Sequence, residues 1–150
     1  MRAVVQRCDF SSVFVGNEKV GSSDKGLLVL LGVCNGDTQK EAELLARKIS
    51  SLRIFCDENE KMNLSVKDIS GSILAVSNFT LYADIKKGNR PSFINAMEPV
   101  MAEELYDCFC ENLKNLQVPT QKGMFGADMR IDMRCNGPVT IIMDTGIWKK

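Results

Sequence analysis

Residues 73–84 read Ile-Leu-Ala-Val-Ser-Asn-Phe-Thr-Leu-Tyr-Ala-Asp, and the rest of the chain is organised around them. The apolar run at 73–76 is typical of a strand buried on both faces. Polar groups at the end of a buried strand need partners, because they cost free energy when unpaired. These polar groups serve either a functional site or only the neighbouring backbone. We expect the strand to continue with alternating faces, Ser77, Phe79 and Leu81 on one side and Asn78, Thr80 and Tyr82 on the other.

Hydrophobic patterns predict further strands and two helices. Thr38 and Glu41 form a capping box that begins a helix running to about residue 50, and Glu98-Pro99 begins a second helix. The buried stripe of this second helix is expected to consist of Ala102, Leu105, Tyr106, Phe109 and Leu113. Strands are predicted at residues 2–8, 12–15, 19–21, 26–34, 53–56, 128–135 and 139–144, with turns at Gly16-Asn17 and Asn136-Gly137-Pro138. We therefore expect one α+β domain over residues 1–150. Its mostly antiparallel sheets are expected to curl into a barrel-like core with the two helices packed outside.

The composition excludes several kinds of chemistry. The chain has 150 residues, six cysteines and no histidine. Without histidine there is no Ser-His-Asp or Cys-His catalysis and no His-ligated metal site. No Cys-x-x-Cys pair is present, so we expect no metal and no cofactor. The cysteines are expected to be reduced, mostly buried thiols of a cytoplasmic protein.

Charge and hydropathy limit the partners. Lys plus Arg and Asp plus Glu both number 19, so the formal net charge is zero. The overall field therefore cannot attract nucleic acid, and a polyanion must be held by a local basic patch. The longest apolar run, at 27–31, is too short to span a bilayer, and polar residues interrupt the apolar N-terminal stretch. We expect neither a membrane span nor a signal peptide.

Two separated stretches together resemble the signatures of a known family. Residues 77–84 resemble the Ser-Gln-x-Thr-Leu-x-Ala-Asp signature of the D-aminoacyl-tRNA deacylases, and residues 137–140, Gly-Pro-Val-Thr, resemble their second signature. The chain departs from the family in two places, with Asn78 for the usual Gln and Cys135-Asn136 for the usual Asn-Asp. The likeness covers essentially the whole chain, including segments 1–7, 26–32, 53–55, 61–63, 90–93 and 125–129.

The resemblance implies an activity and a mechanism. The family hydrolyses the ester between a D-amino acid and the terminal adenosine of tRNA, and also removes glycine mischarged on tRNA-Ala. It is homodimeric, and its Gly-Pro peptide is cis and enters the partner subunit's pocket, where it rejects L side chains. Main-chain N–H groups support the oxyanion, while the 2′-hydroxyl of the terminal adenosine helps to activate water.

The resemblance also assigns roles to particular residues. The catalytic pocket is implied to consist of Ser77, Asn78, Phe79 and Thr80, and the chirality gate of Gly137 and Pro138. The remaining pocket residues are implied to be Arg7, Phe125, Met129, Val139 and Thr140, with Arg7 anchoring the Gly-Pro loop across the dimer. The tRNA phosphates are expected to contact Lys86, Lys87 and Arg90, with Lys149 and Lys150 as further candidates. The alternative for these five cations is an ordinary solvated surface charge.

Three other functions stay open from the sequence. An esterase with a protein nucleophile, Thr80 or Cys135, predicts a covalent acyl intermediate. A non-catalytic tRNA-binding dimer predicts binding without ester turnover. A related deacylase with relaxed chirality removes a small L-amino acid, but the intact Gly-Pro-Val-Thr signature argues against it.

Overall fold

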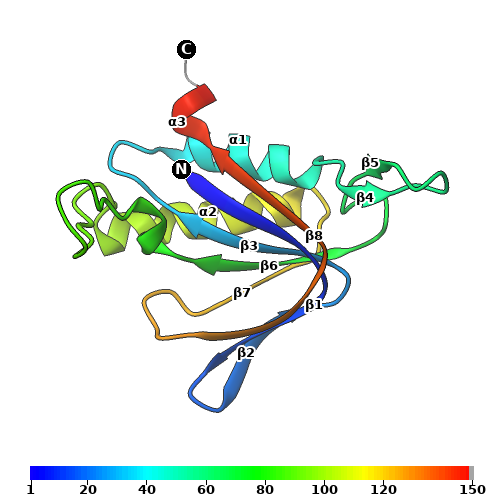
Figure 1. Ribbon diagram of the computed structural model, residues 1–150, viewed down its shortest axis with the longest axis horizontal. Helices are drawn as coiled ribbons and strands as arrows, with labels where there is room; N and C mark the ends of the chain where they lie inside the picture. The colour runs from blue at the N-terminus through cyan, green and yellow to red at the C-terminus, as the bar shows by residue number, and fades with distance from the viewer. Residues whose placement is uncertain (149–150) are drawn as a thin grey trace.

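The computed structural model describes residues 1–148 and shows a curved sheet covered by two long helices (Figure 1). The strands are β1 (Arg2–Val15), β2 (Glu18–Ser23), β3 (Gly26–Gly32), β4 (Phe55–Cys56), β5 (Met62–Leu64), β6 (Ser72–Ser77), β7 (Thr120–Lys122) and β8 (Arg130–Asp144). The helices are α1 (Gln39–Ser50), the 3-10 helix η1 (Phe79–Tyr82), α2 (Pro99–Asn115) and α3 (Thr145–Trp148). Over these 148 residues, none of the helices combines the length and the hydropathy needed to cross a bilayer.

The long strand β1 organises the main sheet. Its first half, Arg2–Cys8, pairs antiparallel with β3, its second half, Ser11–Val15, pairs antiparallel with β2, and β8 runs antiparallel along its other edge. Beyond β3 the sheet continues through the parallel strands β6 and β7. The Ser22 N–H of β2 donates to Gln121 Oε1 next to it on β7, at 2.8 Å, so the sheet curls almost closed. The expected α+β domain with a barrel-like core is confirmed.

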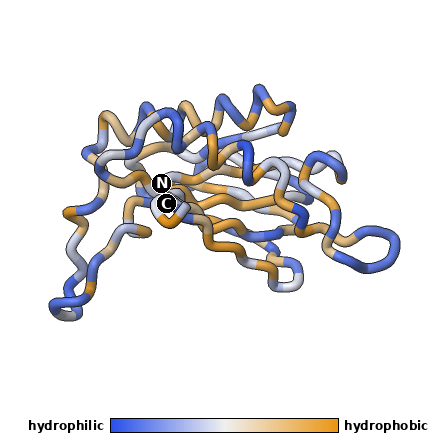
Figure 2. The backbone as a smooth tube through the Cα atoms, turned by 90° about the horizontal axis from the view of Figure 1, so that it is seen from above, coloured by the Kyte–Doolittle hydropathy of each residue, from blue (hydrophilic) through white to orange (hydrophobic). Residues whose placement is uncertain are grey.

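The alternation of side chains along β3 separates two hydrophobic clusters. Leu27, Val29 and Leu31 belong to the cluster beneath the two helices, whereas Leu28 belongs to the cluster on the other face, inside the curved sheet. Figure 2 shows hydrophobic residues along the strands and hydrophilic residues in the projecting loops. The buried stripe predicted for the second helix is confirmed in α2 and consists of Ala102, Leu105, Tyr106, Phe109 and Leu113.

Both long helices begin where the sequence predicts. The Thr38 side chain accepts from the Lys40 N–H at 3.3 Å, and the Thr38 N–H donates to Glu41 Oε2 at 2.7 Å, which is the expected capping box. Helix α2 has Pro99 in its first turn and Glu98 as its N-cap. Because these caps satisfy N–H groups that the helix itself leaves free, they set both helix starts.

The strand predicted to run on through residues 77–82 ends at Ser77 instead. Its neighbour β3 ends at Gly32, and the last link between the two strands is the Asn78 N–H donating to Leu31 O at 2.8 Å. With no strand left to pair with, the chain turns into η1, and the Leu81 N–H bonds to Asn78 O at 3.3 Å. The predicted alternation of faces over residues 77–82 is therefore wrong, as is the extension of the neighbouring strand to residue 34.

The two strands predicted at 128–135 and 139–144 are one continuous strand, β8, and no hairpin separates them. Both halves pair with β1, since Cys8 lies opposite Cys135 and Gln6 lies opposite Thr140. Residues 136–139 bulge out between these two pairs. The prediction of a turn is wrong because a 14-residue β1 is long enough to pair with both halves.

Candidate active site

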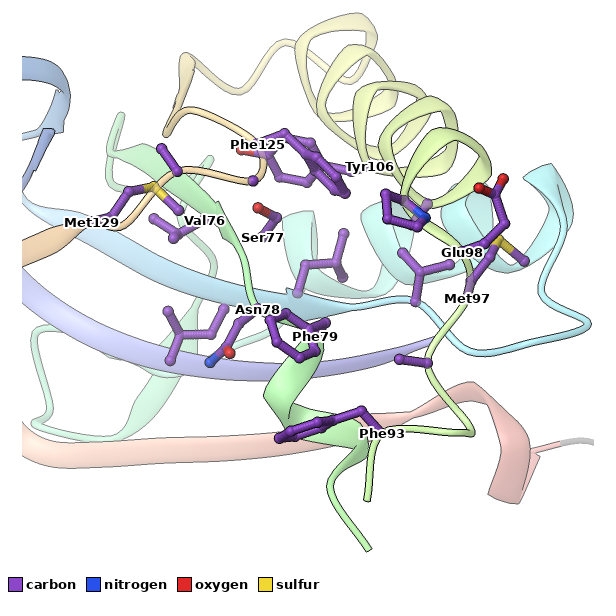
Figure 3. A pocket seen from close by; sticks show the side chains of 18 of the residues that line it. Val76, Ser77, Asn78, Phe79, Phe93, Met97, Glu98, Tyr106, Phe125 and Met129 are labelled. Carbon is purple, nitrogen blue, oxygen red and sulfur yellow. The ribbon is translucent and has the colours of Figure 1, made fainter. Parts of the chain in front are cut away.

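A cavity of about 680 Å³ opens where β6 ends, between the sheet and the start of α2 (Figure 3). Its walls come from the ends of β3 and β6 and from the segments at 93–99 and 125–131. The lining is largely apolar with a few polar groups, which is typical of a small-molecule site. The structure brings together five of the residues expected in the site: Ser77, Asn78, Phe79, Phe125 and Met129.

Two polar side chains that line the cavity, Glu98 and Tyr106, already form hydrogen bonds with main-chain groups. The Glu98 carboxylate accepts from the Val100 N–H at 3.2 Å and from the Met101 N–H at 2.8 Å. The Tyr106 hydroxyl donates to Ala75 O at 2.8 Å, and burial raises the pKa of this phenol well above its ordinary value. Neither side chain is therefore placed as a general base for ester hydrolysis.

The turn after β6 presents free main-chain donors beside the cavity. The first N–H groups of a helix have no intrahelical acceptor. Among residues 1–148, the N–H groups of Phe79 and Thr80 at the start of η1 have no hydrogen-bond partner. The Thr80 hydroxyl donates to Asn78 Oδ1, which orients it but does not deprotonate it. Two adjacent free N–H groups are an arrangement that stabilises the oxyanion of an acyl-transfer reaction.

Arg2 fixes η1 against the sheet. Its Nη1 donates to Leu81 O at 2.6 Å, and its Nε and Nη2 donate to Asp144 Oδ2 at 3.0 and 2.8 Å. The same guanidinium lies 4.8 Å from the centre of the Tyr82 ring. Burial raises the pKa of the Tyr82 phenol; burial also opposes ionisation of Asp144, but the hydrogen bonds from Arg2 hold the pKa of this carboxyl below its ordinary value. The position of η1 therefore depends on β1 and β8.

The Gly137-Pro138 segment lies in the bulge of β8, and none of residues 136–140 lines the cavity of the same chain. The Gly137–Pro138 peptide is cis, and Gly137 has a φ of +125°. Arg7 Nε donates to Asn136 O at 3.0 Å and Arg7 Nη1 donates to Ile54 O at 2.7 Å. Arg7 thus anchors the bulge of its own chain.

The other expected pocket residues near the bulge also lie apart from the cavity. Val139 packs against the cluster beneath the helices, and the Thr140 hydroxyl donates to Gln6 Oε1 at 2.7 Å. Thr80, also expected in the pocket, is not among the residues that line the cavity. Within one chain, the rest of the expected site is divided into two parts. The cavity holds residues 77–79, Phe125 and Met129, and the bulge region holds Arg7, Gly137, Pro138, Val139 and Thr140.

The basic side chains expected to hold tRNA lie on an exposed loop. Lys86, Lys87 and Arg90 follow η1, and none of the ion pairs found within residues 1–148 involves them. Lys149 and Lys150 lie outside the described residues. The loop joins η1 to the segment at 93–99 that lines the cavity, so its cations lie along the chain between two parts of the cavity wall.

The cysteines are poorly placed for nucleophilic catalysis. Burial raises the pKa of Cys8 to about 11 and that of Cys110 to about 12, so neither thiol ionises readily near neutral pH. Cys135 lies opposite Cys8 on β8 and is not among the residues that line the cavity. The expectation of mostly buried thiols is only partly met, because Cys56 and Cys135 are exposed.

Several residues of the cavity are not expected from the sequence, among them Phe93, Met97, Glu98 and Tyr106. The sequence pattern places Tyr106 in the buried stripe of the helix, and Glu98 only at the helix start. Phe93 belongs to a segment that matches the family, which is the one available signal. Long-range folding brings these residues beside Ser77, and no local pattern encodes that proximity.

Comparisons with known proteins agree with this architecture. The chain matches the family described as D-Tyr-tRNA(Tyr) deacylase over residues 4–144. The D-aminoacyl-tRNA deacylase of Fusobacterium nucleatum is 51% identical over 145 residues, which cover 97% of this chain and 96% of that protein. The D-aminoacyl-tRNA deacylase of Roseiflexus sp. (strain RS-1) is 50% identical over 150 residues, which cover 100% of this chain and 97% of that protein.

Solved structures share the whole fold. A c-Myc DNA Unwinding Element Binding Protein superposes with a TM-score of 0.90 at 43% identity, over 96% of this chain and 98% of that chain. A probable eukaryotic D-amino acid tRNA deacylase superposes with a TM-score of 0.78 at 17% identity, over 95% of this chain and 97% of that chain, which compares the fold alone.

The fold, the cavity and these relatives define the class of the protein, which is a hydrolase with a single α+β domain. More particularly, the chain belongs to the D-Tyr-tRNA(Tyr) deacylase family. The resemblance of the two sequence signatures to that family is confirmed.

Proposed function

We propose that this protein hydrolyses the ester joining a D-amino acid to the terminal adenosine of tRNA, and that it also removes glycine mischarged on tRNA-Ala. Membership of the family supports this activity. The structural observation that carries it is the pair of free N–H groups at Phe79 and Thr80 beside an apolar cavity. The products are free tRNA and the free amino acid, and we place the reaction in the cytoplasm, where tRNA is charged.

The proposed mechanism uses the substrate's own hydroxyl. Water attacks the ester carbonyl, and the N–H groups of Phe79 and Thr80 stabilise the oxyanion that forms. The 2′-hydroxyl of the terminal ribose helps to activate this water, and the departing 3′-oxygen takes up a proton. The absence of histidine from the chain and the engagement of Glu98 in capping α2 support this assignment. The Thr80 hydroxyl donates to the Asn78 amide oxygen and not to a base, which gives little support to a protein nucleophile.

We further propose that the protein is a homodimer in which the Gly137-Pro138 bulge of one subunit enters the cavity of the other. An L side chain then meets the bulge, while a D side chain or a glycine hydrogen points away from it. The exposed position of this bulge in a single chain supports the arrangement. Strand β8 also exposes two large apolar side chains, Met133 at 46% and Ile142 at 72%, which a second subunit on this strand would cover.

The first test compares D-tyrosyl-tRNA with L-tyrosyl-tRNA. We expect the D ester to be hydrolysed at least about 100-fold faster, because a steric clash with the L side chain leaves the reacting atoms misplaced. The loss of tRNA-bound tyrosine over time measures both rates. Binding of tRNA without hydrolysis of either ester would instead support a non-catalytic tRNA-binding protein.

The chirality gate is tested by Gly137→Ala. A Cβ at this position would lie 2.8 Å from the Val139 N and 3.0 Å from Arg7 Nη2, and the φ of +125° is one that alanine rarely adopts. We expect the bulge to shift and the preference for the D ester to fall about 10-fold or more.

The matched control for the gate is Gly36→Ala. Gly36 also has a positive φ, +87°, but a Cβ there would meet nothing within 4 Å. This variant is expected to keep the preference for the D ester. A Gly137→Ala protein with undiminished preference would show that chirality is selected elsewhere.

A further inference from the structure

Two aromatic rings lie together at the mouth of the cavity. The rings of Phe79 and Phe93 meet edge to face, with centroids 4.9 Å apart and an angle of 72° between their planes (Figure 3). Phe79 is 58% exposed. A pair of partly exposed rings at a cavity mouth offers π-faces to a flat ligand.

A basic loop is tied to this aromatic pair. The main chains of Asp84 and Ser92 exchange two hydrogen bonds, of 2.8 and 2.9 Å, which close the loop formed by residues 85–91. Phe93 directly follows Ser92, and Phe79 is the first residue of η1, which leads into the loop. The loop carries three of the cations described above, while its one neighbouring acid, Asp84, accepts from the Lys86 N–H at 2.9 Å. The aromatic pair and the cations therefore belong to one segment whose two ends are joined by main-chain hydrogen bonds.

We infer that this surface, the Phe79–Phe93 pair with loop 85–91, binds the nucleotides that precede the terminal adenosine in the single-stranded 3′ end of tRNA. The ring of Phe93 stacks on the penultimate base, and the loop cations contact the adjoining phosphates. Single-stranded nucleic acids are bound in this way, by aromatic side chains for the bases and cations for the backbone. The inference rests on the proposed function, because the ester must lie in the cavity for these nucleotides to reach this surface at the cavity mouth.

The positive charge of this surface favours nucleic acid as its ligand over a second copy of this chain. Charged residues, lysine above all, are depleted from the centres of protein–protein interfaces. Three cations without ion-pair partners among residues 1–148 instead match the charge of the phosphates that follow a stacked base.

The test compares Phe93→Leu with the parent protein on two substrates. One is D-tyrosyl-tRNA, and the other is the D-tyrosyl ester of adenosine, which lacks every preceding nucleotide. Stacking on one base corresponds to about 5- to 150-fold in affinity. We expect kcat/KM for D-tyrosyl-tRNA to fall about 10-fold further than kcat/KM for the adenosine ester, mainly through KM, because only the tRNA carries the stacked base. A loss shared by both substrates reflects the place of Phe93 in the cavity wall.

A matched control is Trp148→Leu, which removes another partly exposed aromatic, 39% exposed, that does not line the cavity. This variant is expected to hydrolyse both substrates like the parent. Equal losses on the two substrates in Phe93→Leu, or no loss on D-tyrosyl-tRNA, would overturn the inference. A change of oligomeric state in Phe93→Leu would show that this surface contacts a second copy of the chain instead.

The cations are tested independently by the double variant Lys86→Gln/Lys87→Gln, with Lys40→Gln/Lys48→Gln on the outside of α1 as its control. We measure binding of a labelled single-stranded CCA oligonucleotide against salt concentration. The slope of log affinity against log salt is expected to decrease by about 0.7 for each phosphate that the protein no longer neutralises, in the loop variant only. An unchanged slope in the loop variant overturns the phosphate contacts. If the parent protein hydrolyses neither D-tyrosyl-tRNA nor the D-tyrosyl ester of adenosine, the proposed function is wrong. Binding of the CCA oligonucleotide by the parent, the loop variant and Phe93→Leu still tests the inference in that case.

Discussion

D-tyrosyl-tRNA that ends in 2′-deoxyadenosine is expected to be hydrolysed about 10²- to 10⁴-fold more slowly than the normal substrate, the usual contribution of a positioned acid–base group. The cavity supports this expectation, because its one lining carboxylate among residues 1–148 caps α2 and the Tyr106 hydroxyl is bonded to Ala75. In the proposed mechanism, removing the 2′-hydroxyl leaves the attacking water without a nearby group to activate it. Single-turnover hydrolysis with enzyme in excess measures the chemical step directly.

Two controls separate chemistry from binding. The deoxy ester should compete with the normal substrate with nearly unchanged affinity, since the ester and the base are the same in both. Thr80→Val should keep measurable hydrolysis and form no acyl-enzyme, because the Thr80 main-chain N–H is retained. Full hydrolysis of the deoxy ester, together with an acyl intermediate that disappears in Thr80→Val, would assign the reaction to a threonine nucleophile.

Gly26→Ala is expected to have the largest effect on stability, about 3 kcal/mol or more. An alanine Cβ at this position would lie 1.8 Å from Ser72 O and 2.8 Å from the Ser72 N. These atoms belong to the main chain of β6, and moving them away breaks the pairing of Ser72 with Gly26. Moving Gly26 instead also breaks its pairing with Cys8 on β1. Urea unfolding monitored by circular dichroism measures the change in the free energy of unfolding.

Lys25→Ala is the matched control for Gly26→Ala. Lys25 is the adjacent residue and its side chain is exposed. Both variants thus introduce alanine, but the side chain at position 25 does not enter the sheet. We expect the free energy of unfolding to change by less than about 0.5 kcal/mol. A Gly26→Ala protein as stable as this control would mean that β3 and β6 can separate at their first pair without cost.

The core and the helix starts could be predicted because their causes are local. The apolar run of β3 needs burial on both faces, and the Thr38–Glu41 capping box satisfies free N–H groups wherever the helix lies. The stripe along α2 follows from the 3.6-residue period alone. Residues 77–79, Phe125 and Met129 are expected in the site through the resemblance to the family and do line one cavity.

What only the tertiary structure decided was where strands end and which segments meet. Ser77 is the last residue of β6 because β3 offers no further partner, and the chain then turns so that the Phe79 and Thr80 N–H groups stay free. The Asn136-Gly137-Pro138 stretch looks like a hairpin turn locally but becomes a bulge, because β1 pairs with both halves of β8. The sequence by itself determined which residues are apolar, which caps begin the helices and which motifs the chain carries. Pairing between strands distant in sequence decided their geometry, because a hydrogen-bonded ladder extends only as far as its neighbour does.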